Sequence, residues 1–105
     1  MYILEAHAAD VWQMDSNVRQ NVVFATPKDY AERSNVADSC VRKLNIQIPA
    51  VLDKFDNAVE QAYTGWPDRL YVIDRSGKVA FKSKPGPFGF HPADVRKTLE
   101  GMVAR

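Results

Sequence analysis

Residues 70–81 read LYVIDRSGKVAF. Two runs rich in β-branched and aromatic residues, Leu70–Ile73 and Val79–Phe81, flank the turn Asp74–Gly77. Runs of this kind, joined by a short turn that contains glycine, predict an antiparallel β-hairpin. This hairpin is the clearest element in the chain, and the segments on either side of it decide the fold class.

A long helix is expected before the hairpin, over about residues 27–44. Thr26 can accept a hydrogen bond from a free backbone N–H, and Pro27 suits the first helical position. Tyr30, Ser34, Ala37, Val41 and Leu44 recur at helical spacing, which predicts that they share the inner face.

Shorter elements complete the order. The apolar run Met1–Leu4 is typical of a buried strand. A second helix is expected over residues 56–63, with Val59, Ala62 and Tyr63 inward, and a last helix opens at His91-Pro92 with Val95, Leu99, Met102 and Val103 inward. A brief strand is expected within residues 46–52. The order strand, loop, helix, short strand, helix, hairpin and helix predicts an α/β fold in which helices flank a small mixed sheet.

The bulk composition excludes several classes of protein. The 105 residues suit one domain, and 14 basic residues nearly cancel 13 acidic ones. No basic stripe appears, so no nucleic-acid partner is expected. Apolar runs are too short to cross a bilayer, and no secretion signal is visible, so a cytoplasmic protein with no membrane partner is predicted.

The metal-binding and redox residues are few. Cys40 is the single cysteine, so neither an internal disulfide nor a Cys-x-x-Cys motif can form within one chain. His7 and His91 lie far apart and lack the spacing of a zinc site, so no metal and no cofactor are predicted.

Three segments carry a resemblance to a known family. They are residues 2–10 (YILEAHAAD), residues 53–73 with the run WPDRLYVI, and residues 86–92 (GPFGFHP). In this order they resemble the iodothyronine deiodinases and their bacterial relatives, which are thioredoxin-like proteins. The resemblance implies a thioredoxin-like fold with a C-terminal β-hairpin.

The chain departs from the family at its start. Members have a further strand and helix, whose loop holds a catalytic selenocysteine or cysteine, and Met1 falls where the second strand begins. The expectation is therefore one truncated thioredoxin-like domain over residues 1–105 that lacks this N-terminal unit. A family histidine is also absent near Thr26-Pro27, and Pro85 stands where some members have arginine.

Glu5, His7 and Cys40 are the catalytic candidates. Residues two apart on a strand point to the same side, so Glu5 and His7 are predicted to lie close together. The resemblance implies that they sit beside the redox centre and serve substrate binding and proton transfer; alternatively they are a pair kept from ancestry. A reactive thiol needs a lowered pKa, and the position of Cys40 late in a helix favours a passive thiol over a replacement nucleophile.

Five residues are candidates for binding a small aromatic ligand. Aromatic side chains can line such a pocket, although packing in the core or in loops is the favoured explanation. Thioredoxin-like proteins often have a cis proline before the hairpin, but an ordinary trans bond is the alternative. The five are Trp12, Trp66, Pro67, Arg69 and Phe88.

The missing unit leads to a prediction of association. In this family the absent strand is central, and each buried unpaired backbone group costs about 1–3 kcal/mol against about 5–15 kcal/mol of net stability. Either the Met1–Leu4 strand moves to the hairpin or a second copy fills the gap, and a homodimer is predicted.

Three functions stay open. The favoured one is a non-catalytic dimer with a binding role for a small molecule or a protein. The alternative is a thiol-dependent oxidoreductase, a reductive dehalogenase or redoxin, whose nucleophile is Cys40 or lies upstream. The third is a fragment whose full-length parent is active.

Overall fold

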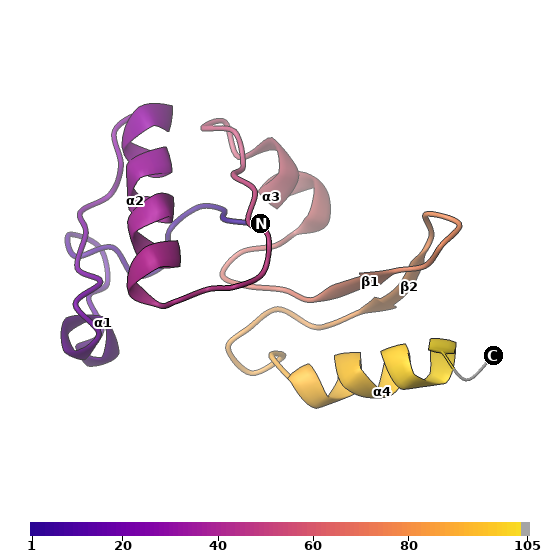
Figure 1. Ribbon diagram of the computed structural model, residues 1–105. Coiled ribbons are helices and arrows are strands. Elements are labelled where there is room, and N and C mark those ends of the chain that lie inside the picture. Colours follow the sequence, from indigo (N-terminus) through magenta and orange to yellow (C-terminus); the bar gives the residue numbers. More distant parts are fainter. Residues whose placement is uncertain (104–105) are drawn as a thin grey trace. The chain divides into compact units, whose positions relative to one another are not determined.

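The computed structural model describes residues 1–103 (Figure 1). Contacts divide the chain into two compact units, Met1–Tyr63 and Thr64–Arg105. Each unit has its own elements and is described by itself. The first holds three helices, and the second holds a hairpin and one helix.

Unit 1 contains α1 (Asp15–Arg19), α2 (Tyr30–Lys43) and α3 (Ala58–Tyr63). The start of α2 is fixed by Asp29, whose carboxylate accepts a hydrogen bond from Glu32 N at 2.8 Å. The predicted start at Thr26-Pro27 is wrong, because the N–H and hydroxyl of Thr26 donate to the Asp10 carboxylate at 2.7 and 2.9 Å instead.

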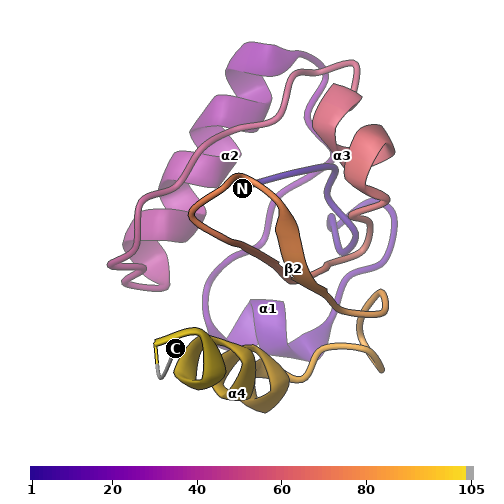
Figure 2. The same cartoon turned by 90° about the vertical axis from the view of Figure 1, so that its right-hand side faces the viewer.

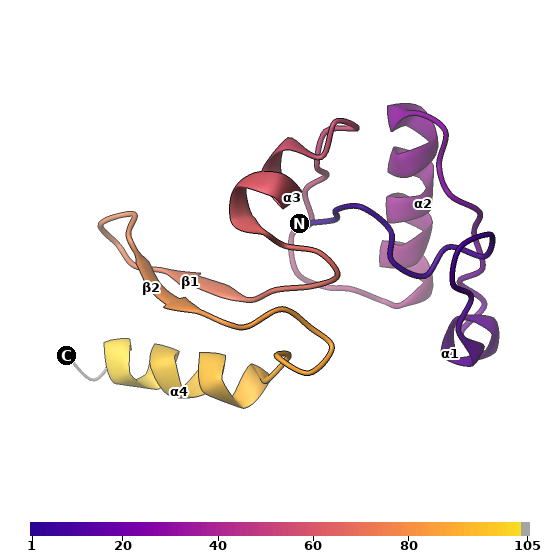
Figure 3. The same cartoon turned by 180° about the vertical axis from the view of Figure 1, so that it is seen from behind.

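Only one residue of the predicted Met1–Leu4 strand pairs with another segment. Tyr2 forms an isolated parallel bridge with Leu52. Tyr2 N donates to Val51 O at 2.7 Å, and Asp53 N donates to Tyr2 O at 2.9 Å. The N-terminal segment therefore runs between α2 and α3, held to the residue 51–53 loop (Figure 3).

The inner face of α2 is rotated from the predicted one. Tyr30 and Leu44 are 50% and 41% exposed, and Ser34 is also exposed. The buried residue of the helix is Arg33, with Cys40 half-buried two turns further along. The helical spacing predicted that Tyr30 and Ser34 face inward, whereas in the structure the charged side chain of Arg33 does so.

Unit 2 consists of β1 (Tyr71–Ile73), β2 (Val79–Lys82) and α4 (Pro92–Val103). The strands are antiparallel, with Tyr71 opposite Lys82 and Val72 opposite Phe81. The Asp74 carboxylate accepts from the N–H groups of Ser76 and Lys78 at 2.8 and 3.0 Å and closes the turn. Figure 1 shows α4 lying along the hairpin, and Figure 2 gives a nearly end-on view of the two. The predicted hairpin and last helix are confirmed.

The apolar core of the described residues is small. Its buried hydrophobic members are Ala8 and Val22 in unit 1 and Val72 in unit 2. The inward predictions for Tyr63, Leu99 and Val103 are wrong, because these side chains are 47%, 45% and 85% exposed; Ala62 is exposed as well. The protein is a small α/β molecule whose sheet, among residues 1–103, is two-stranded and antiparallel.

Candidate functional site

A buried ion pair is the centre of unit 1. The Glu5 carboxylate lies 3.3 Å from the Nε of Arg33, and the two side chains are 8% and 2% exposed. Removing two charges from water is costly, and such a pair persists only where further contacts stabilise both ions. The surroundings of Arg33 provide those contacts.

Arg33 joins three segments of unit 1. Its guanidinium Nη1 donates to Lys54 O at 2.9 Å, and its guanidinium carbon lies 4.9 Å from the centroid of the Phe55 ring. The aromatic face attracts a cation, more strongly when both are desolvated. Through these contacts the N-terminal segment, α2 and the residue 53–55 loop meet at one side chain.

Asp53 is the second buried carboxylate, with 1% of the residue exposed. Its two oxygens accept from Val59 N at 3.0 Å and from Glu60 N at 2.8 Å, and one of them also accepts from Lys54 N. Burial alone would raise its pKa, but these N–H donors and nearby Arg33 bring the pKa below its usual value. Asp53 thus binds the free N–H groups at the start of α3 from outside the helix.

The Glu5 carboxylate is buried beside Tyr2. Both of its oxygens are inaccessible to solvent, and its contact with Arg33 is an ion pair without hydrogen-bond geometry. Burial, followed by the negative charge of Glu5, raises the pKa of Tyr2. The site therefore pairs a phenol that keeps its proton with a carboxylate able to accept a hydrogen bond.

Cys40 belongs to the same region as Glu5. The thiol is half-buried, and burial raises its pKa, with a smaller rise from Glu5 and an opposing effect of Lys43. A raised pKa leaves little thiolate at neutral pH, and the thiolate is the nucleophilic form.

His7 faces a different neighbour from Glu5. Its Nδ1 lies 3.3 Å from Trp12 O, and the imidazole and indole rings meet edge to face with centroids 4.3 Å apart. The carbonyl of His7 also accepts from the Asn17 side chain at 3.2 Å. The segment around Glu5 and His7 is not a strand, so the alternation that predicted a shared side does not operate there.

The remaining binding candidates lie in unit 2. Arg69 donates from Nε to Ser83 O at 2.7 Å and from Nη1 to Thr64 O at 3.1 Å, so its guanidinium fastens loop backbone. The Trp66–Pro67 bond is cis. The Trp66 side chain is 43% exposed and Phe88 is 92% exposed.

Sequence reasoning missed Arg33 and Asp53. Charged residues are seldom buried, so a pattern of apolar positions assigns them to the surface. One signal was available for Arg33: it stands one turn before the half-buried Ala37 and two turns before Cys40.

Two further properties concern the described residues as a whole. No three His, Cys, Asp or Glu side chains converge as a metal ion would require, within residues 1–103. None of the helices described is both long enough and apolar enough to span a lipid bilayer.

Comparison with known proteins gives the family. The family model described as iodothyronine deiodinase matches residues 1–103. The chain is 33% identical over 100 residues to the type I iodothyronine deiodinase of Xenopus laevis, covering 95% of this chain and 37% of that protein. It is 31% identical over 106 residues to the thyroxine 5-deiodinase of Gallus gallus, covering 100% and 39%.

The chain thus spans less than two-fifths of the length of these relatives. No solved structure matches it. The family match runs through the segments that contain Glu5, Arg33, Asp53 and the hairpin, and the chain belongs to the iodothyronine deiodinase family.

Proposed function

We propose that this chain forms a thioredoxin-like, deiodinase-type module that does not catalyse by itself, associates as a homodimer and binds a small aromatic molecule or a protein. The observation that carries the non-catalytic part is Cys40. It is the single thiol of the sequence, and burial raises its pKa, whereas a redox nucleophile needs the opposite shift.

The order of unit 2 supports the thioredoxin-like part of the proposal. An antiparallel hairpin followed by a helix is the C-terminal arrangement that the resemblance implies. Glu5 and His7 then supply binding groups: a buried carboxylate and an imidazole held against Trp12. A cytoplasmic location stays a prediction from the sequence.

The alternative is a thiol-dependent reductive dehalogenase whose nucleophile lies outside these residues. The chain covers 37% and 39% of two relatives named as deiodinases, which favours this alternative over one that uses Cys40. In the reaction a carbon–iodine bond becomes a carbon–hydrogen bond, iodide and a proton are released, and two thiols are oxidised to a disulfide.

Iodide release tests whether this chain catalyses by itself and whether Cys40 is its nucleophile. The purified chain is incubated with thyroxine and excess dithiothreitol, beside a Cys40→Ser variant and buffer with dithiothreitol alone. We expect equal release from all three samples, because Cys40 supplies little thiolate. Release above the buffer rate that Cys40→Ser abolishes would identify Cys40 as the nucleophile and overturn the proposal; release that the variant keeps would overturn the non-catalytic part as well.

The binding role has its own measurement. Trp12 and Trp66 are 59% and 43% exposed, so an iodinated aromatic ligand beside either indole will quench its fluorescence. We expect saturable quenching by thyroxine, and Trp12→Phe and Trp66→Phe variants assign it to one unit. Linear, non-saturating quenching in the wild type and in both variants would contradict a binding site for this ligand.

A further inference from the structure

One face of α4 carries apolar side chains that are exposed among residues 1–103. Pro92, Leu99 and Val103 follow one another along it, and Leu99 and Val103 are 45% and 85% exposed. The helix contacts both strands of the hairpin, and its half-buried residues are Val95, Thr98 and Met102. Exposed apolar side chains that share a helix face are typical of a contact surface.

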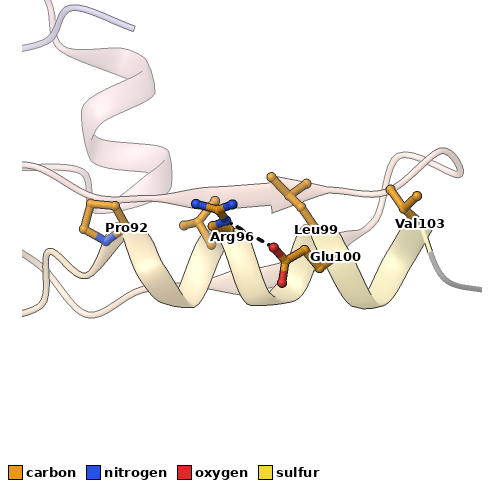
Figure 4. Close-up of a pocket in the computed structure, with 6 residues that line it drawn as sticks. Pro92, Arg96, Leu99, Glu100 and Val103 are labelled. Atoms are coloured by element: carbon orange, nitrogen blue, oxygen red, sulfur yellow. Dashed lines mark hydrogen bonds and ion pairs between the residues drawn. The ribbon is translucent and has the colours of Figure 1, made fainter.

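A shallow open groove of about 590 Å³ runs along this face. Figure 4 shows Pro92, Leu99 and Val103 along α4, with Arg96 and Glu100 between them. Those two charged side chains form an ion pair at 3.1 Å, and both are largely exposed. The residues lining the groove, called the α4 groove below, are Pro92, Val95, Arg96, Leu99, Glu100 and Val103.

The charges of the α4 groove are self-complementary. When two identical helices pack antiparallel about a two-fold axis, flanking residues on one edge of the stripe meet the same edge of the other copy. With the axis at the level of Thr98, Arg96 meets Glu100 of the second copy, and Glu100 meets Arg96 of the second copy. The same register brings Pro92 near Val103 of the second copy.

We infer that the α4 groove is the contact surface of a homodimer in which α4 packs antiparallel against α4 of a second copy. This inference rests on the proposed homodimer and names its interface. A 12-residue helix is about 18 Å long, and one face of it buries less than the ~800 Å² per partner of a stable complex. The dimer is therefore weak, with a dissociation constant in the range of roughly tens of micromolar.

Charge reversal tests the inference. Sedimentation equilibrium at low salt compares the wild type with Arg96→Glu, Glu100→Arg and the double swap Arg96→Glu/Glu100→Arg. Each single variant places like charges opposite each other twice, so we expect self-association about tenfold weaker or more. We expect the double swap to dimerise like the wild type, and a 1:1 mixture of the single variants to form a heterodimer.

Two further variants control for other effects. Leu99→Lys puts a charge in the centre of the groove and should weaken the dimer still more. Arg42→Glu breaks the equally exposed Arg42–Asp38 pair of α2, spaced i,i+4 at 3.3 Å, and should leave association unchanged. Because all of these positions are exposed, circular dichroism should show an unchanged fold.

Failure of the α4 interface and failure of the proposed homodimer give different results. Dimers of wild-type strength in every α4 variant would overturn the α4 interface and leave a homodimer formed through another surface. A wild-type chain that stays monomeric up to about 500 µM, well above the expected dissociation constant, would overturn both.

Discussion

Arg33 is the residue on which the interior of unit 1 depends. Its cation faces the Glu5 carboxylate, the Lys54 carbonyl and the Phe55 ring, and Asp53 lies close enough for Arg33 to lower its pKa. A cation between two buried carboxylates lowers the electrostatic cost of each. Where a larger protein would place apolar side chains, this unit has an ionic cluster.

Replacing Arg33 by Met should therefore be severe. The variant leaves the Glu5 carboxylate buried and unpaired, and breaking a buried ion pair from one side costs about 3–5 kcal/mol. Urea denaturation followed by circular dichroism measures the free energy of unfolding. The double variant Glu5→Gln/Arg33→Met should recover part of the lost free energy of unfolding, because it leaves no buried charge without a partner.

Arg42→Met is the matched control on the same helix. Arg42 is exposed and its pair with Asp38 is solvated, so the change should cost about 0.5 kcal/mol or less. An Arg33→Met variant as stable as Arg42→Met would show that the ionic cluster contributes nothing to stability.

At the scale of single elements, α3 depends on a side chain five residues before its start. A six-residue helix is too short to be stable alone, and Asp53 binds the N–H groups of Val59 and Glu60. The carboxylate charge also suits the positive end of the helix. The helix and the residue 53–55 loop are thus one cooperative piece.

Acid should lower the stability of α3 and the residue 53–55 loop. Because the pKa of Asp53 is lower in the folded chain than its usual value of 3.8, its contribution is present above that pH and is lost as pH falls through the folded pKa. Asp53→Asn turns one acceptor into a donor opposite an N–H, and should cost about 1–3 kcal/mol at pH 7.

Asp53→Asn should also make stability depend less steeply on pH below the usual carboxyl pKa of 3.8, measured by urea midpoints at each pH. Asp56→Asn is the control, since its exposed side chain accepts one bond, from Ala58 N at 3.1 Å. An equally steep dependence on pH in Asp53→Asn and the wild type would contradict the role given to Asp53.

The hairpin turn allows a paired glycine experiment. Gly77 has φ +82°, a conformation that side chains rarely adopt, although a Cβ there would meet nothing within 4 Å. Gly77→Ala should therefore destabilise by about 1 kcal/mol through backbone strain alone. Gly101→Ala, in α4 with equally open space, should stabilise by about 0.5–1 kcal/mol, because alanine is the better helix former.

Thermal unfolding of the two variants measures the sign of each change. Melting temperatures that move in the same direction would show that the backbone conformation at Gly77 does not limit the hairpin.

At the scale of the whole molecule, apolar burial is scarce. Many large hydrophobic side chains of the described residues are exposed, among them Ile48 at 74%, Val51 at 59% and Val103 at 85%. A chain of about 100 residues has little stability to spare, so covering such side chains by association would be favourable.

The proposed homodimer predicts a melting temperature that depends on concentration. Association stabilises the folded form by mass action, so raising the protein from about 5 to about 500 µM should raise the melting temperature by several degrees, on the order of 5 °C. Scanning fluorimetry or calorimetry over that range measures it. An unchanged melting temperature across the series would contradict a dimer of the proposed strength.

The sequence by itself determined the local elements and the family. The hairpin at residues 70–81 and the helix after His91-Pro92 follow from turn chemistry and from apolar periods that act over a few residues. The segments that resemble deiodinases are likewise continuous in the chain, and the family match confirms what they indicate.

Only the tertiary structure decided which charges are inside. Glu5, Arg33 and Asp53 stand 28 and 20 residues apart along the chain, so nothing in their local patterns tells that they meet. Burying a charge is unfavourable until its partners are in place, and those partners exist only in the folded unit. The shift of the α2 face toward Arg33, and the binding of α3 by Asp53, follow from that meeting.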